Sequence, residues 1–291
     1  MTRYKTASRI RELYFRKYLK FRFGIVDTSH ANQFYALWHI LKSHPLKSNY
    51  LIDIGASDGV SFSVVRPLLL LGWHGLLIEN EKEPFKKLES LYVSNKSVNT
   101  LCEKVSPSNI DSILDKEKIA GIGFLNIDID AYDLEIFRTF ARRAIRPEII
   151  SIEINEKIPP PLYFEVQYSS EYMFNPHDYG GAFFGCSLQA VFETALEHNY
   201  EVIHLEYNNV FLIDRRYVQK DKMSFQNARE LWLQGYVRQA LRDSYFPWNS
   251  EYSHLFETTP ADGLKFFEDK FESCPYQYIL TLENGKSHEL Q

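Results

Sequence analysis

One segment, Tyr-Leu-Ile-Asp-Ile-Gly-Ala-Ser-Asp-Gly-Val at residues 50–60, constrains the fold more than any other part of the chain. A short apolar run reaches Asp53 and is followed by two glycines, Gly55 and Gly59. This pattern is typical of a buried strand that turns sharply onto a helix, where small residues let a nucleotide-like ligand approach the backbone. We therefore expect a ligand to bind at the end of this strand.

A second apolar run, residues 74–78, ends in Glu79. An acid at this place can accept hydrogen bonds from both hydroxyls of a ribose. A dinucleotide fingerprint would need glycines spaced as GxGxxG, whereas Asp58 puts a carboxylate where the pyrophosphate would lie. The ligand is therefore predicted to carry a ribose and no phosphate, which disfavours a dehydrogenase. The alternative is that the glycines are ordinary turn glycines, that Asp53 caps a helix and that Glu79 is a solvated strand end.

Strand-like and helix-like segments alternate along the chain, which predicts a doubly wound α/β fold with a mostly parallel sheet. Strands are expected at residues 50–54, 74–78, 98–102, 123–129, 148–154, 200–206 and 210–213, and helices at 2–22, 31–41, 61–71, 83–92, 133–141, 187–198 and 231–241. The last two strands are expected to form a hairpin, turned by Asn208 and Asn209, that adds an antiparallel edge. Loops at the carboxyl ends of the strands should form the site.

Acidic side chains follow two further strands. Asp128, Asp130 and Asp133 come at the end of the fourth strand, and Glu153 and Asn155 at the end of the fifth. Residues two apart in an extended chain project to the same side, so adjacent strands should bring several carboxylates together. Carboxylates that close repel, so at least one must be protonated, paired with a cation or bound to a metal. The alternative is that Asp133 caps the next helix and the other acids are solvated.

The run NIDIDAYDLEIF at residues 126–137, followed by RPEIISIEIN, resembles the FkbM-like class I methyltransferases that use S-adenosylmethionine (SAM). Bacterial members of this group carry an I-D-I-D-G-x-D segment and then R-P-x-x-x-x-I-E-x-N; Ala131 stands here in place of the usual glycine. The similarity extends over residues 50–216. It implies a Rossmann-like, mostly parallel seven-stranded sheet with helical N- and C-terminal additions. A weaker resemblance to sugar O-methyltransferases with a D-x-D-x-Y segment matches Asp128, Asp130 and Tyr132.

The resemblance implies a role for each matching residue. Asp130 is the candidate base, Asp128 lies between cofactor and acceptor, and Glu153 orients the acceptor or a metal. These three acids are also the candidate ligands of Mg²⁺, which prefers oxygen ligands. The expected SAM contacts are Asp53, Gly55, Ser57, Asp58, Gly59, Glu79, Asn80 and Asp128.

The predicted reaction is O-methylation, or less readily N-methylation, of a sugar or another small hydroxylated acceptor. The resemblance connects such enzymes with polysaccharide biosynthesis. A rival hypothesis is a SAM- or glycan-binding interaction protein without turnover, which three acids splayed apart into solvent would favour.

A tyrosine-rich insert at residues 156–185 is predicted to close over the acceptor, because rings and a few polar groups suit sugars. His177 within it is a candidate base or only a hydrogen-bonding bystander. We divide the chain into an N-terminal helical region (1–45), a SAM-binding domain (46–216) and an aromatic-rich helical appendage (217–291). The appendage is expected to pack on the domain or on another subunit, which allows a homo-oligomer.

The bulk properties of the chain exclude several protein classes. A formal charge of −5 over 291 residues argues against a nucleic-acid binder. No apolar run is long enough to span a membrane, and the basic, aromatic N-terminus lacks the apolar core of a signal peptide. That stretch is expected to be an amphipathic helix, with contact to membrane headgroups or an anionic partner as the alternative. Cys102, Cys186 and Cys274 are too widely spaced for a disulfide framework or a zinc site, so we expect a cytoplasmic protein.

Overall fold

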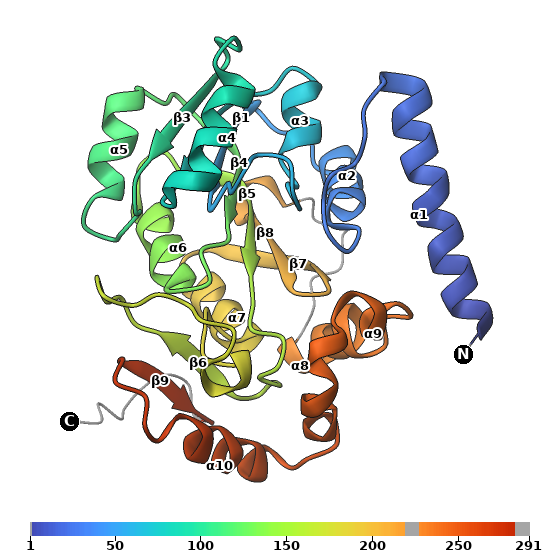
Figure 1. Ribbon diagram of the computed structural model, residues 1–291, viewed down its shortest axis with the longest axis vertical. Helices are drawn as coiled ribbons and strands as arrows, with labels where there is room; N and C mark the ends of the chain where they lie inside the picture. Colours follow the sequence, from blue (N-terminus) through green and yellow to red (C-terminus); the bar gives the residue numbers. More distant parts are fainter. Residues whose placement is uncertain (1, 219–226, 283–291) are drawn as a thin grey trace.

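A computed structural model describes residues 2–218 and 227–282. Its centre is a seven-stranded sheet with the order β3-β2-β1-β4-β5-β8-β7 (Figure 1). Five neighbouring strands are parallel, and β8 runs antiparallel to both β5 and β7. The strands are β1 (Tyr50–Ile54), β2 (His74–Glu79), β3 (Val98–Cys102), β4 (Ile122–Ile127), β5 (Pro147–Glu153), β7 (Tyr200–Glu206) and β8 (Asn209–Asp214). The predicted fold class is therefore confirmed.

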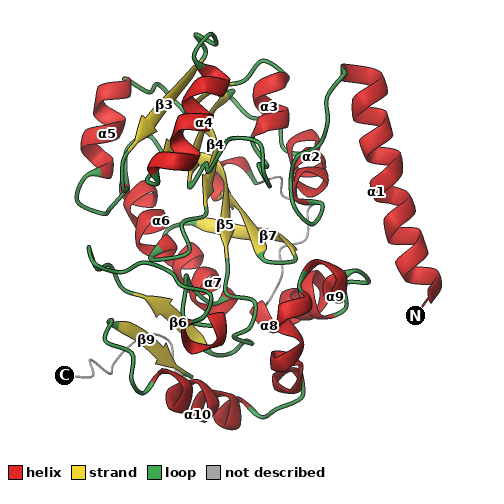
Figure 2. Ribbon diagram, in the orientation of Figure 1, coloured by secondary structure: helices red, strands yellow, loops and turns green. Residues whose placement is uncertain are grey.

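Helices cover both faces of this sheet (Figure 2). Successive strand residues point to opposite faces, so Leu51 packs in one apolar cluster and Ile52 in the other. Both clusters are buried, which explains why these strands read as continuous apolar runs. One cluster includes side chains of α1 (Thr2–Phe23), α2 (Gln33–Ser43), α3 (Arg66–Leu70) and α4 (Lys82–Tyr92), and the other includes those of α5 (Ile110–Glu117), α6 (Asp133–Arg142) and α7 (Leu188–Glu197).

The C-terminal region packs on the rest of the chain, with Trp232, Phe267 and Phe271 buried in the second of these clusters. It contains α8 (Ala228–Trp232), a π-helical turn (Leu233–Val237), α9 (Arg242–Tyr245), 3₁₀ turns within Pro247–Phe256, and α10 (Pro260–Phe271). It also contains β9 (Tyr278–Thr281), which pairs antiparallel with β6 (Tyr163–Val166) of the insert. The sequence pattern predicted helix here and did not predict this strand. Residues 219–226 and 283–291 of the predicted appendage lie outside the described residues.

Several predicted boundaries differ from the structure. The helix expected at residues 61–71 begins only at Arg66, because the preceding residues form a turn and Pro67 suits a first helical turn. The fourth strand ends at Ile127, so Asp128 opens a loop. The hairpin turns at Tyr207 and Asn208 rather than at Asn208 and Asn209, and Tyr207 takes the positive φ, 55°. The antiparallel strand of this hairpin, β8, lies inside the sheet, and β7 forms the edge.

No helix within the described ranges has the length and apolar character needed to cross a bilayer.

Candidate active site

The loop after β1 is drawn tightly against the loop after β4. Gly55 has a φ of +91°, and a Cβ at this position would lie 1.8 Å from the backbone oxygen of Asp128. Gly55 and Ala56 both donate backbone hydrogen bonds to the carbonyl oxygen of Ile78 at 3.0 Å, and Asp128 donates to that of Ile54 at 3.0 Å. Only glycine fits at position 55, and the result is that three strand ends meet at one point.

Glu79, at the end of β2, is almost fully buried and organises the same loop. Its Oε2 accepts a hydrogen bond from the backbone N–H of Ser57 at 2.8 Å, and its Oε1 accepts from that of Glu81 at 2.7 Å. Ser57 has a φ of 48°, so this carboxylate holds the loop in a left-handed conformation. An ionised carboxylate has about four acceptor sites, so Glu79 keeps capacity for a ligand.

Asp53 and Asn126 face each other across paired strands, since they are direct partners in the β1–β4 register. Asn126 Nδ2 donates to Asp53 Oδ1 at 2.9 Å, and burial raises the pKa of Asp53 to about 6. The buried Oδ1 of Asn126 has no hydrogen-bond partner within residues 2–218 and 227–282. Sequence analysis missed Asn126, although the register of two parallel strands ending together would have placed it beside Asp53.

Three carboxyl groups converge beyond β4 and β5, as predicted. Asp128, Asp130 and Glu153 each place one carboxylate oxygen within 4.8 Å of the other two. Asp130 adopts a positive φ of 52°, a strained conformation for a non-glycine residue that turns the loop back toward Glu153. These acids are therefore not splayed apart into solvent.

Burial and mutual repulsion keep protons on this acid cluster. Burial, followed by the charge of Asp130, raises the pKa of Asp128 to about 8. Burial and the charges of Asp128 and Asp130 raise the pKa of Glu153 well above its ordinary value. The pKa of Asp130 is also raised by burial, but a hydrogen bond with Glu153 and the charge of Lys157 act in the opposite direction. The hydrogen bond with Glu153 also lowers the pKa of Asp128, so the charge of Lys157 is what favours the ionised form of Asp130 over that of Asp128.

The residues around the cluster hold it in place. Asn208 Nδ2 donates a hydrogen bond to Glu153 Oε1 from the β7–β8 turn. The carboxylate of Asp133 accepts from the backbone N–H groups of Ile129 and Ala131, both at 2.9 Å. Asp133 therefore braces the loop that carries Asp128 and Asp130, a larger role than capping the helix. Asn155, predicted to point the same way as Glu153, instead donates to two carbonyl oxygens of the insert.

These strand ends open into a pocket of about 610 Å³. Its walls include seven of the predicted site residues, namely Asp53, Gly55, Ser57, Glu79, Asn80, Asp128 and Asp130. Glu153 does not line the pocket, so it lies behind the other two acids of the cluster. A volume in this range suits a ligand of the size of a nucleoside derivative together with part of a second molecule.

Two predicted contacts, Asp58 and Gly59, do not line the pocket. The carboxylate of Asp58 accepts hydrogen bonds from the backbone N–H groups of Val60 and Ser61 and from the Ser61 hydroxyl, so it shapes a turn. A Cβ on Gly59 would lie 2.6 Å from Leu88 Cδ1, so this glycine lets α4 pack on the loop. Both residues support the loop from outside the pocket.

The pocket also has walls that the sequence analysis did not predict. Lys104, after β3, lines it and donates hydrogen bonds through Nζ to the carbonyl oxygens of Ser170 at 2.8 Å and Tyr172 at 3.1 Å. This lysine links the pocket rim to the insert, whose residues 172–174 also line the pocket. The position of Lys104 after a parallel strand was the available signal. His177 is exposed and does not line the pocket.

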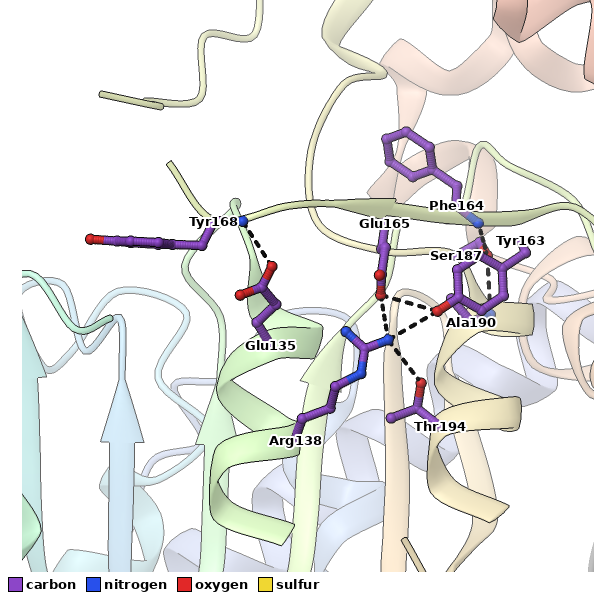
Figure 3. Close-up of polar contacts among 9 residues, drawn as sticks. All are labelled: Glu135, Arg138, Tyr163, Phe164, Glu165, Tyr168, Ser187, Ala190 and Thr194. Carbon is purple, nitrogen blue, oxygen red and sulfur yellow. Dashed lines mark hydrogen bonds and ion pairs between the residues drawn. The ribbon is translucent and has the colours of Figure 1, made fainter. Parts of the chain in front are cut away.

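The insert is fixed to the helices beside it through a buried ion pair (Figure 3). Arg138 of α6 donates through Nη2 to Glu165 of β6 at 2.7 Å and to the Tyr163 hydroxyl at 3.0 Å. Further along the insert, the backbone N–H of Tyr168 donates to Glu135 of α6 at 2.9 Å. These contacts set the position of the insert wall over the pocket.

Residues 90–174 match the model of the methyltransferase FkbM domain. No curated protein sequence matches the chain.

Among solved structures, the chain is similar to an S-adenosylmethionine-dependent methyltransferase from Clostridium acetobutylicum, at 11% identity and a TM-score of 0.40 over 70% of this chain and 98% of that one. It is also similar to the N-terminal domain of EvdMO1 with SAH bound, at 12% identity and a TM-score of 0.39, over 64% of this chain and 80% of that one. A third similarity is to monomeric WbdD, at 16% identity and a TM-score of 0.38, over 67% of this chain and 43% of that one. All three TM-scores are low, so the fold assignment rests on the strand order described above.

Proposed function

We propose that the chain carries a methyltransferase domain and moves a methyl group from SAM to a hydroxyl oxygen of a sugar or another small hydroxylated acceptor. The match of residues 90–174 to the methyltransferase FkbM domain supports this proposal. The observation that carries the proposal is a single pocket with two unlike ends. One end has a glycine loop and a buried glutamate, and the other has Asp128 and Asp130.

The first end has the chemistry to hold SAM. Gly55 lines the pocket and has no side chain, so a bound molecule can lie close to the main chain there. Glu79 has acceptor capacity for two ribose hydroxyls. The unpartnered Oδ1 of Asn126 and the carboxylate of Asp53 suit the ammonium group of a methionine moiety. SAM offers all of these groups and carries no phosphate.

The second end has the chemistry to accept a proton. In methyl transfer the acceptor oxygen forms a bond to the methyl carbon, the carbon–sulfur bond breaks, and its electron pair stays on sulfur to give S-adenosylhomocysteine. We assign the hydroxyl proton to Asp130, because Lys157 and the Glu153 hydrogen bond support its ionised form. Asp128 separates the cofactor end from the acceptor end. Glu153, which does not line the pocket, donates a hydrogen bond to Asp130. Alignment of the two substrates supplies most of the remaining rate enhancement.

The insert supplies the wall that suits a sugar. Tyr172, Met173 and Phe174 line the pocket opposite the loops of the sheet. Flat aromatic and apolar surfaces pack on the C–H faces of sugar rings, while nearby acids bind the hydroxyls. A sugar acceptor would connect the reaction with polysaccharide biosynthesis.

Magnesium binding is a separate proposal. Asp128, Asp130 and Glu153 offer three oxygen atoms at mutual distances compatible with one hard cation, and a cation there would lower the pKa of an acceptor hydroxyl. The raised pKa values of these acids describe a cluster that holds protons when no cation is bound.

Four further expectations also stay predictions: the domain division, the cytoplasmic location, the absence of nucleic-acid partners and the homo-oligomer through the C-terminal region.

The decisive experiment measures cofactor binding and methyl transfer in one set of variants. We expect SAM to bind by calorimetry and a panel of nucleotide sugars to yield at least one methylated product by mass spectrometry. Asp130→Asn should keep SAM affinity and lose most of the turnover, whereas the exposed Asp178→Asn in the insert serves as the matched control. Full turnover in Asp130→Asn would eliminate it as the base. SAM binding with no product on any acceptor would favour the rival hypothesis of a binding protein.

A further inference from the structure

The positive charge of the chain is concentrated in its first helix. Residues 2–23 contain eight lysines and arginines and one acidic residue, a formal charge of +7, whereas the whole chain carries −5. The rest of the chain therefore carries −12. Such an asymmetry between one helix and the remaining protein is typical of a segment that meets an anionic surface.

The inner side of α1 is packed against the protein. Phe15 and Leu19 are buried there, and the ring of Phe15 contacts Phe34 and Tyr35 of α2, with centroids 6.1 Å and 4.9 Å away. Figure 1 shows α1 at the edge of the molecule, beside α2. This contact fixes which side of the helix faces outward.

The outward side of α1 carries large apolar side chains that remain exposed to a large extent. Ile10, Leu13, Tyr14 and Phe21 are 45%, 58%, 71% and 94% exposed, respectively. At 100° per residue these four positions fall within an arc of about 100°, and Phe15 and Leu19 lie on the opposite side. Phe21 is the most exposed of the large apolar side chains in the described part of the chain.

Basic side chains accompany this apolar stripe. Lys17 lies within its arc and Lys20 at its margin, and both are exposed. Long lysine side chains can place their charge at the headgroup level while their methylene stems lie beside apolar residues. A helix whose outward side combines aromatic and aliphatic residues with lysines has the residue types of helices that lie in a membrane interface.

We propose that α1 is a docking surface for a membrane with anionic lipids, on which it lies parallel to the bilayer with Ile10, Leu13, Tyr14 and Phe21 in the headgroup and upper acyl region. The charge of the helix decides between this occupant and a second copy of the chain. Pairing two such stripes would bring two helices of charge +7 together, whereas anionic lipids neutralise that charge. The proposal is independent of the methyltransferase activity.

The test is co-sedimentation of the full chain with vesicles. We expect binding to vesicles of equal parts phosphatidylglycerol and phosphatidylcholine, little binding to pure phosphatidylcholine, and release by high salt. Phe21→Ser should weaken binding about tenfold, because it removes a side chain that would be buried in lipid. Val93→Ser is the matched control. Val93 is 77% exposed, but it follows the last residue of α4 and does not belong to α1.

A second pair of variants tests the electrostatic part without changing apolar residues. Lys17→Glu with Lys20→Glu should weaken binding more than tenfold, whereas Lys96→Glu with Lys116→Glu, equal in charge change and also exposed, should weaken it much less. Circular dichroism checks that each variant is folded. Equal binding of all variants, or no binding of the unmodified chain, would overturn the proposal. A dimer in solution that Phe21→Ser dissociates, without vesicle binding, would assign the surface to a second copy instead.

Discussion

Glu79 gives the sharpest test of the cofactor end of the pocket. Its carboxylate already accepts two backbone hydrogen bonds, from Ser57 and Glu81, and we expect it to accept the ribose hydroxyls of SAM as well. Replacing it by alanine therefore removes both a ligand contact and the brace of the loop. The two effects are measurable separately, because one changes affinity and the other changes folding stability.

The expected size follows from the bonds lost. A hydrogen bond to a charged group contributes roughly 1.5–3 kcal/mol, so loss of the ribose contact should raise the Kd for S-adenosylhomocysteine about 10- to 150-fold. The two backbone N–H groups that lose their acceptor should lower the free energy of unfolding by about 1–3 kcal/mol in urea. Calorimetry gives the first quantity and a denaturation curve the second.

Two further variants separate the brace from the contact. Glu79→Gln keeps the size of the side chain and one acceptor oxygen, so its loss of stability should be smaller than that of Glu79→Ala. Ser57→Gly keeps the backbone N–H and relaxes the positive φ of 48°, so a loss of affinity in this variant would report a contact of the Ser57 side chain with the ligand. Glu83→Ala, whose side chain is 81% exposed, is the control. A Kd for Glu79→Ala within threefold of the unmodified protein would refute the assignment of Glu79 to the ribose.

Four other outcomes are expected. Gly55→Ala should abolish S-adenosylhomocysteine binding and cost at least about 2 kcal/mol in urea, because its Cβ would lie 1.8 Å from a backbone oxygen; binding within threefold of normal would contradict this. Arg138→Met should lower the free energy of unfolding by about 3–5 kcal/mol, since it leaves buried Glu165 without its partner, and adding Glu165→Met should restore most of the loss. The pKa of Asp128 is raised from its ordinary value of 3.8 to about 8, so the unfolded chain loses this proton first, and the stability contributed by Asp128 falls as the pH rises from about 4 to about 8. The melting temperature should therefore fall between about pH 5 and about pH 8 by less in Asp128→Asn than in the unmodified protein, and equal slopes would speak against it. If Mg²⁺ is bound, a chelator should abolish methyl transfer and added Mg²⁺ restore it, whereas full activity in chelator would remove the metal from the site.

The sheet was predictable from the sequence, and this prediction is confirmed. The resemblance to FkbM-like methyltransferases agrees with the match of residues 90–174 to the methyltransferase FkbM domain. Most of the parallel strands are short apolar runs with an acidic residue close to their carboxyl end, and this local pattern also placed Glu79, Asp128 and Asp130 at one edge. The convergence of Asp128, Asp130 and Glu153 followed from the same rule, because neighbouring parallel strands end together.

The remaining features depend on contacts that no local pattern contains. In the sequence, Gly59 looks like a ligand-binding glycine. In the structure, glycine is required there because a Cβ would clash with Leu88 of α4. The helix expected at residues 61–71 was too long, because backbone N–H groups at the start of this segment donate hydrogen bonds to the Asp58 carboxylate and form a turn. The insert was expected to be a loop, and its strand pairs with residues more than a hundred positions later in the chain, at 278–281.

The pairing of β6 with β9 means that the two ends of the pocket are completed at different times during synthesis of the chain. The cofactor end needs only strands β1 to β4, so all of its residues have been synthesised before the middle of the chain is made. The wall that faces the acceptor belongs to the insert, and β6 meets its only strand partner in the described residues when β9, near the end of the chain, has emerged. A nascent chain therefore contains all residues of the proposed cofactor end well before it can complete the proposed acceptor wall.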